Sequence, residues 1–285
     1  STISSYANPV LGELAVADID LGLVLRVLEP IWNTKNETAS RVRGRIESIL
    51  DWATVRGYRQ GDNPARWKGH LDVILPAPAK VQKTEHHAAL PYVDMSAFMT
   101  DLRQRKGIAA RALEFTILTA TRSGESRGAE WSEIDLASKI WTIPAERMKA
   151  GKEHRIPLSE SVCKLLESTL RVSGTGSRYV FPSLKGSTLS DMTLTAVLRR
   201  MERNDITVHG FRSSFRDWAA ETTAFPREVI EHAMSHQLKD KAEAAYQRGD
   251  LLIKRAKLME AWAAYCEHSS GMAEVTPINV KNAQV

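Results

Sequence analysis

A proline-containing stretch near residue 80 is the feature that most limits how this chain can fold. Residues 75–91 read LPAPAKVQKTEHHAALP, with three prolines, two lysines and no apolar periodicity. Proline fixes φ and donates no backbone hydrogen bond, so long helices and central strands avoid such segments. Because 285 residues suffice for two hydrophobic cores, we predict a domain at 1–75, a semi-extended linker at 76–91, a second domain at 92–268 and a tail at 269–285.

Composition excludes several classes of protein. Hydrophobic residues make up 43% of the chain and charged residues 26%, as in soluble globular proteins. No apolar run approaches the roughly 18 residues of a membrane span. The first ten residues, STISSYANPV, lack the basic and apolar regions of a secretory signal. We therefore expect a cytoplasmic protein without membrane contact, and the net charge of +5 leans toward polyanionic partners.

Residues that commonly hold metals do not cluster in the sequence. The two cysteines, Cys163 and Cys266, form neither a disulfide framework nor a metal motif. His86 and His87 are adjacent, so they cannot share a helix face, and no cysteine lies near them. We expect no metal and no cofactor.

Apolar spacing predicts helices in the N-terminal part. Residues 18–31 read as one helix, and a second is predicted to begin near Thr38, an N-cap candidate. One apolar stripe of this second helix contains Val42, Ile46, Ile49, Leu50 and Ala53.

Basic residues outnumber acidic ones on the rest of this surface, by eight to four between Lys35 and Lys68. For any single arginine, the alternative explanation is that it lies on the solvent-exposed face of a helix without a binding role. As a group they predict contacts to the phosphates of DNA. The candidates are Arg41, Arg43, Arg45, Arg56 and Arg59.

The C-terminal part mixes helical and strand patterns. Residues 96–105, 110–120 and 160–172 are helical in pattern, whereas 133–159 (EIDLASKIWTIPAERMKAGKEHRIPLS) indicates strands joined by polar turns. The predicted fold is therefore mainly α with a small β-sheet.

The segment VHGFRSSFRDWA (208–219) suggests an anion site. Phe211, Phe215 and Trp218 repeat at helical spacing, and His209 and Arg212, three residues apart, point the same way at the helix start. Unpaired N–H groups at a helix start favour an anion. The alternative for His209 alone is a capping or core histidine.

At this point the ordered motifs resemble those of the tyrosine recombinase (phage integrase) family, most closely integrases of prophages and genomic islands. The matching stretches cover about residues 86–265 and include TxxRxGE, RMK, RIPLS, HGFRxxFRDWA, SH and AYxRxDLL. A lone HxxR would be weak evidence, whereas the ordered set is specific.

The resemblance implies roles for individual residues. Lys149 is preferred to Lys152 as the hairpin lysine because its spacing to Ile156 fits the family's hairpin. Ala120 stands where the family commonly has glycine, and we expect little effect because alanine tolerates helical geometry. The implied catalytic residues are Arg122, Lys149, His209, Arg212, His236 and Tyr246, the last as nucleophile, with Glu125 supporting Arg122.

The resemblance further implies a helical core-binding domain followed by a catalytic domain. It implies a metal-independent recombinase that cleaves and rejoins double-stranded DNA at attachment sites through a 3′-phosphotyrosine, integrating or excising a mobile element. Such a protein would act on the nucleoid as a tetramer on DNA, with a directionality factor and a host DNA-bending protein as possible partners. Long members of the family carry an arm-binding domain ahead of the core-binding one, so this chain is expected to be either a fragment of such a protein or a shorter relative. The rivals are a non-catalytic DNA-binding protein on the same scaffold and a type IB topoisomerase.

The last predicted helix, 251–268, carries an apolar stripe that includes Leu252, Leu258, Met259, Trp262 and Tyr265. Two alternatives stay open. The stripe packs on its own domain, or it docks onto a neighbouring protomer, as C-terminal segments of the family often do.

Overall fold

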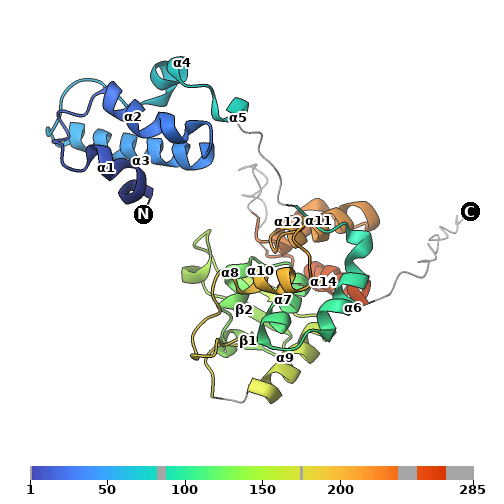
Figure 1. Cartoon of the computed structure of the whole chain (residues 1–285). Helices are drawn as coiled ribbons and strands as arrows, with labels where there is room; N and C mark the ends of the chain where they lie inside the picture. The colour runs from blue at the N-terminus through green and yellow to red at the C-terminus, as the bar shows by residue number, and fades with distance from the viewer. Residues whose placement is uncertain (1, 82–87, 174–175, 237–248, 268–285) are drawn as a thin grey trace, which may run out of the picture. The chain divides into compact units, whose positions relative to one another are not determined.

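The computed structural model describes residues 2–81, 88–173, 176–236 and 249–267 (Figure 1). The chain forms two compact units, Ser1–His86 and His87–Val285, each with its own hydrophobic core. The fold is mainly helical with a small sheet, which confirms the predicted fold class.

Unit 1 is built around two packed helices. Asp20 begins the first of them by accepting a hydrogen bond from the Leu23 N–H at 2.8 Å. Trp32, at its end, stacks on Trp67 with ring centroids 5.5 Å apart. The elements are η1 (Ile3–Ala7), α1 (Asn8–Leu11), α2 (Leu21–Trp32), α3 (Asn36–Val55), η2 (Trp67–Leu71), α4 (Asp72–Ile74) and α5 (Pro78–Val81).

Three details of unit 1 differ from the predictions. Helix α3 begins at Asn36 rather than at Thr38, because the Asn36 side chain donates to the Trp32 carbonyl and joins the turn between the helices. Ile49 is 47% exposed, since it is rotated about 100° around α3 from the buried Leu50. The predicted linker contains the helical turn α5, in which the Ala77 carbonyl accepts from the Lys80 N–H.

The arginines of unit 1 differ in their surroundings. Arg59 is 7% exposed and donates to the carbonyls of Ile19 and Asp62, so it serves packing inside the unit and is unsuited to a surface phosphate contact. Arg43 is half-buried and donates to Glu47 and to the Ala65 carbonyl. The exposed arginines are Arg41, Arg45 and Arg56, for which a DNA contact stays a prediction.

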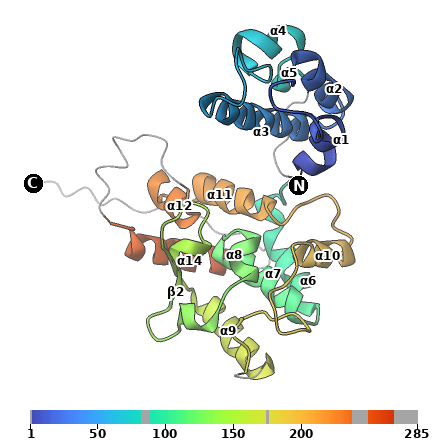
Figure 2. The ribbon, with the colours of Figure 1, turned by 90° about the vertical axis from the view of Figure 1, so that its left-hand side faces the viewer.

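Unit 2 is a helical body (Figure 2). It contains a three-stranded antiparallel sheet, ordered β1-β2-β3. Phe115 in α7 contacts Trp141 of β2 and Phe181, with ring centroids 4.9 and 5.2 Å away, so this helix and the sheet share one core. The helices are α6 (Met95–Gln104), α7 (Ile108–Thr119), α8 (Ser123–Arg127), α9 (Glu160–Ser173), α10 (Thr193–Arg200), α11 (Gly210–Thr222), α12 (Arg227–Ala233) and α14 (Leu252–Glu267). The strands are β1 (Ile134–Asp135), β2 (Ile140–Ile143) and β3 (His154–Pro157), with short turns η3 (Tyr92–Asp94), η4 (Trp131–Glu133) and η5 (Ala145–Arg147).

Helix α14 packs on its own unit. Leu258, Met259 and Trp262 are buried, and the Trp262 indole donates to the Ile117 carbonyl in α7 at 3.0 Å. The contacts of α14 reach α6, α7, α12 and β3. The first alternative is therefore confirmed for the buried residues of this stripe, which pack on their own unit.

Ala120 does not have the helical geometry that we expected. It ends α7 in the left-handed region, at φ 51° and ψ 27°. Its N–H donates to the Ile117 carbonyl, and its own carbonyl accepts from Arg212. Left-handed backbone costs a residue with a Cβ about 1 kcal/mol or more, a cost that glycine, the residue that the family resemblance implies at this position, does not carry.

We expect Ala120→Gly to raise the free energy of unfolding by about 1 kcal/mol, because the backbone strain disappears and the buried methyl is small. The matched control is Ala112→Gly inside α7, where the backbone is helical and glycine should lower the value by about 1 kcal/mol or more. Urea denaturation followed by circular dichroism measures both. Equal losses of stability in the two variants would show that Ala120 is unstrained.

Candidate active site

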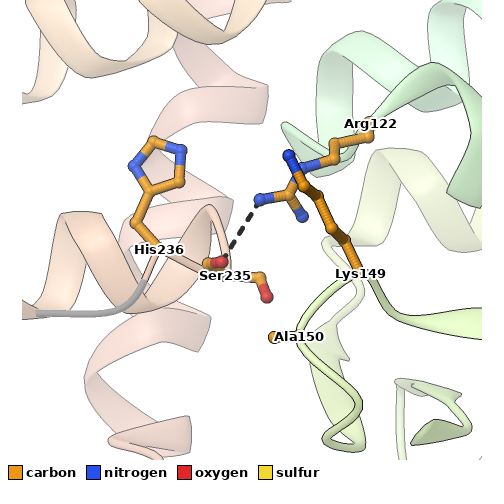
Figure 3. Close-up of a pocket in the computed structure, with 5 residues that line it drawn as sticks. All are labelled: Arg122, Lys149, Ala150, Ser235 and His236. Atoms are coloured by element: carbon orange, nitrogen blue, oxygen red, sulfur yellow. Dashed lines mark hydrogen bonds between the residues drawn. The ribbon is translucent and has the colours of Figure 1, made fainter. Parts of the chain in front are cut away.

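Three polar side chains from separate segments of unit 2 meet at one pocket (Figure 3). Arg122 precedes α8, Lys149 lies in the turn between β2 and β3, and His236 follows α12. Ala150 and Ser235 complete the lining of a cavity of about 370 Å³. The fold thus gathers side chains from three segments, of which the first and the last, at Arg122 and His236, lie more than a hundred residues apart in the chain.

Arg122 is fixed by the acidic residue three positions on. Its backbone N–H donates to Glu125 Oε2 at 2.8 Å, and its Nη1 donates to Glu125 Oε1 at 2.8 Å. Nη2 lies 3.4 Å from the Ser235 carbonyl, the contact drawn in Figure 3. Since the Glu125 side chain is 6% exposed, this ion pair holds the guanidinium at the pocket with little freedom.

Arg212 lies behind this pocket, in the first turn of α11, and is 4% exposed. It donates to the Ala120 carbonyl, to the Met234 carbonyl at 2.7 Å, and to the His236 ring at 2.9 Å. Burial, together with the positive charge of Arg122, lowers the pKa of Arg212 to about 10. The guanidinium therefore stays charged at neutral pH and joins the end of α7 to the turn after α12.

His236 is held between a donor and an acceptor. Its Nδ1 lies 2.7 Å from Glu231 Oε2, and its Nε2 faces Arg212 Nη2. A guanidinium can only donate, so Nε2 accepts and Nδ1 carries the proton that is donated to Glu231. Burial is the main cause that lowers the pKa of His236, partly offset by Glu231. The imidazole is therefore neutral at pH 7.

Two residues of this site were not singled out from the sequence. Glu231, in α12, orients His236 and also lies 3.3 Å from Arg216 Nε. Its only sequence signal is an acidic residue five positions before a histidine, which fits no general motif. Gly210 begins α11 against Ala88, whose carbonyl would lie 2.2 Å from an added Cβ, so glycine is required at this close approach.

The remaining predicted residues are placed as follows. Lys149 lines the pocket and Lys152 does not, which agrees with the preference for Lys149. His209 is exposed at the residue before α11 and is outside the pocket lining. Tyr246, like His86 and His87, lies outside the described residues.

Within the described ranges, no group of three or more histidine, cysteine, aspartate or glutamate side chains could hold a metal ion. Cys163 and Cys266 are buried free thiols. None of the helices in the described part of the chain has the length and apolar character to cross a membrane.

Comparison with known proteins identifies the family. The sequence profile of the phage integrase central domain matches residues 1–70, and that of the phage integrase family matches residues 92–250. The chain therefore belongs to the phage integrase family.

Individual relatives agree with this assignment. The prophage integrase IntA of Escherichia coli K12 is 30% identical over 261 residues, which cover 90% of this chain and 61% of IntA. The integrase of Enterobacteria phage P4 is 26% identical, with 92% of this chain and 62% of that protein covered. This chain thus spans about three-fifths of the length of these relatives.

Solved structures show the same fold. A lambda integrase fragment, in a dimer bound to a COC′ core site, superposes with a TM-score of 0.62 at 17% identity, covering 87% of each chain. The Tn1549 transposon integrase, in complex with circular intermediate DNA, gives 0.58 at 13% identity, covering 86% of this chain and 91% of that one.

Proposed function

We propose that this chain is the DNA-cleaving part of a site-specific recombinase, which breaks and rejoins DNA strands through a 3′-phosphotyrosine on Tyr246 and so integrates or excises a mobile element. The observation that carries the proposal is the convergence of Arg122, Lys149 and His236 at one pocket, with Arg212 bonded behind it. This constellation is suited to a phosphodiester, whose negative charge grows during attack.

The two arginines would stabilise that growing charge. Arg122 faces the pocket in a fixed orientation, and the Nε of Arg212 has no hydrogen-bond partner among the described residues although it is buried. A preorganised donor of this kind typically contributes about 3–4 kcal/mol to the transition state. The neutral His236 supports Arg212 by accepting from its Nη2.

The proton movements follow from ordinary pKa values. A phenol with a pKa near 10 is about 0.1% ionised at pH 7, a deficit of roughly 4 kcal/mol that a cationic pocket reduces. The Tyr246 oxygen would bond to phosphorus as the bond to the 5′ oxygen breaks, and Lys149 would protonate that leaving oxygen. A 5′ hydroxyl from another strand then reverses these steps and releases the tyrosine.

Partners follow from the same proposal. The lambda integrase forms a tetramer on a Holliday junction, and we infer a similar assembly for this protein on paired attachment sites, on the bacterial nucleoid. A directionality factor and a DNA-bending protein stay predictions of the resemblance. Contact between DNA and the exposed side chains of Arg41, Arg45 and Arg56 also stays a prediction.

We expect covalent protein–DNA adduct to form at an undiminished rate in excess EDTA, because arginines and a lysine take the roles that a metal ion fills in metal-dependent nucleases. The measurement uses a nicked attachment-site substrate, which traps the intermediate, and a denaturing gel. A scaffold that only binds DNA would give no adduct. Loss of cleavage on chelation, restored by Mg²⁺, would contradict the proposal, and relaxation of plasmids without an attachment site would indicate a topoisomerase.

A further inference from the structure

Arg147 lies two residues before Lys149, at the base of the turn that carries the lysine. Its side chain is 22% exposed and Met148, between the two, is buried in the core. The side chain of Lys149 is exposed, and the described part of the chain offers it no hydrogen bond. The position of the ammonium group therefore depends on how the base of this turn is held.

The Arg147 guanidinium joins three segments. Nη1 donates to both carboxylate oxygens of Glu133 in η4, and Nη2 donates to the Glu125 carbonyl in α8 at 2.6 Å. Glu133, which is 8% exposed, also accepts from the Trp141 indole in β2 at 2.9 Å. Because both oxygens of this buried carboxylate accept hydrogen bonds, the Arg147 side chain has one well-determined orientation.

Glu125 contacts both Arg122, which lines the pocket, and Arg147, which does not. Its carboxylate holds the backbone and the guanidinium of Arg122, and its carbonyl holds Arg147. A chain of contacts therefore runs from Arg122 through Glu125 and Arg147 to the backbone that carries Lys149. The distance between the Arg122 guanidinium and Lys149 depends on this chain of contacts.

Gly128 leaves the space that the guanidinium occupies. A Cβ added there would lie 2.9 Å from Arg147 Nη2 and 3.4 Å from the Gly124 carbonyl. The φ of Gly128 is −99°, so no unusual backbone conformation demands a glycine. Glycine is required there because the Arg147 guanidinium, held by the hydrogen bonds described above, occupies the space that a Cβ would need.

We propose that Arg147 is a positioning residue for Lys149, which fixes the lysine at the distance from Arg122 that proton delivery to the leaving 5′ oxygen requires. The inference rests on the proposed function. Since a displacement of about 1 Å at a reacting group can reduce a rate roughly 10²-fold, loss of Arg147 should slow the protonation step selectively.

The test compares two nicked substrates that differ only at the scissile bond. In one the leaving atom is the ordinary 5′ oxygen, and in the other it is sulfur. A thiol has a pKa near 8.5, so a thiolate leaves without a proton, and the lysine becomes dispensable. We expect Arg147→Met to form adduct about 10²-fold more slowly than wild type on the oxygen substrate and within about threefold of wild type on the sulfur substrate. Lys149→Ala should show the same pattern.

Two comparisons define what the result means. Arg103→Met removes another partly buried arginine, paired with Glu114 at 2.6 Å in a different part of unit 2, and should match wild type on both substrates. Should Arg147→Met lose its native circular dichroism, Gly128→Ala, which keeps every charge, takes its place and is judged by the same pattern.

Equal slowing on both substrates, or no slowing on either, would overturn the inference. Equal slowing would mean that Arg147 acts on the phosphate-binding arginines or on general stability. No slowing would show that the turn holds Lys149 without help from Arg147. Absence of adduct with wild-type protein on both substrates would instead overturn the proposed function, and this inference with it.

Discussion

Replacing Arg212 by lysine is expected to lower the rate of DNA cleavage by about 10²–10³-fold while DNA affinity changes little. The guanidinium reaches the carbonyls of Ala120 and Met234 and the ring of His236 at once. A lysine ammonium is a single point on a flexible stem and cannot bridge these groups and a phosphate together. Burial would also lower the pKa of a lysine there, which removes part of the charge.

The measurement is single-turnover adduct formation on a nicked attachment site, with binding followed separately by gel shift. Arg127→Lys is the matched control, because the Arg127 side chain is also largely buried (13% exposed). Its bonds go to the Leu189 carbonyl and to Asp191, whereas Arg212 is bonded to His236 of the pocket lining. Both variants should lose some stability, so rates are compared at a temperature where circular dichroism shows both folded. Cleavage by Arg212→Lys at the rate of Arg127→Lys would contradict the role given to Arg212.

Helices were predictable where apolar residues repeat and the backbone stays regular. The spacing in 110–120 and 251–268 predicts α7 and α14, in which most of the repeating apolar residues are buried. Details decided by single contacts were not predictable. Ala120 reads as helical from its type, but the need to turn the chain toward Arg122 places it in the left-handed region.

The site was predictable only through the ordered motifs. Arg122, Lys149 and His236 come from three segments, and nothing in local periodicity brings them together. Several of the groups that orient the predicted residues are backbone carbonyls, such as those of Met234 and Ser235. Because every residue has a carbonyl, the sequence carries no signal for which one is used.

A change of Tyr246 to phenylalanine is expected to abolish cleavage, since the new side chain has no oxygen to attack phosphorus. Folding and DNA binding should be unaffected, because one hydroxyl is lost and all the cationic residues of the pocket remain. Tyr265→Phe is the matched control. Its ring packs against Trp262 in α14, and it should cleave at the wild-type rate.

Mapping the residue that becomes attached to DNA tests the central claim most directly. Wild-type protein is trapped on the nicked attachment site, the adduct is isolated on a denaturing gel, and the nucleotide-bearing peptide is sequenced by mass spectrometry. We predict a 3′-phosphate linked to Tyr246, with adduct from Tyr265→Phe at wild-type yield and none from Tyr246→Phe. Adduct at wild-type yield from Tyr246→Phe, or attachment at another residue, would contradict the account.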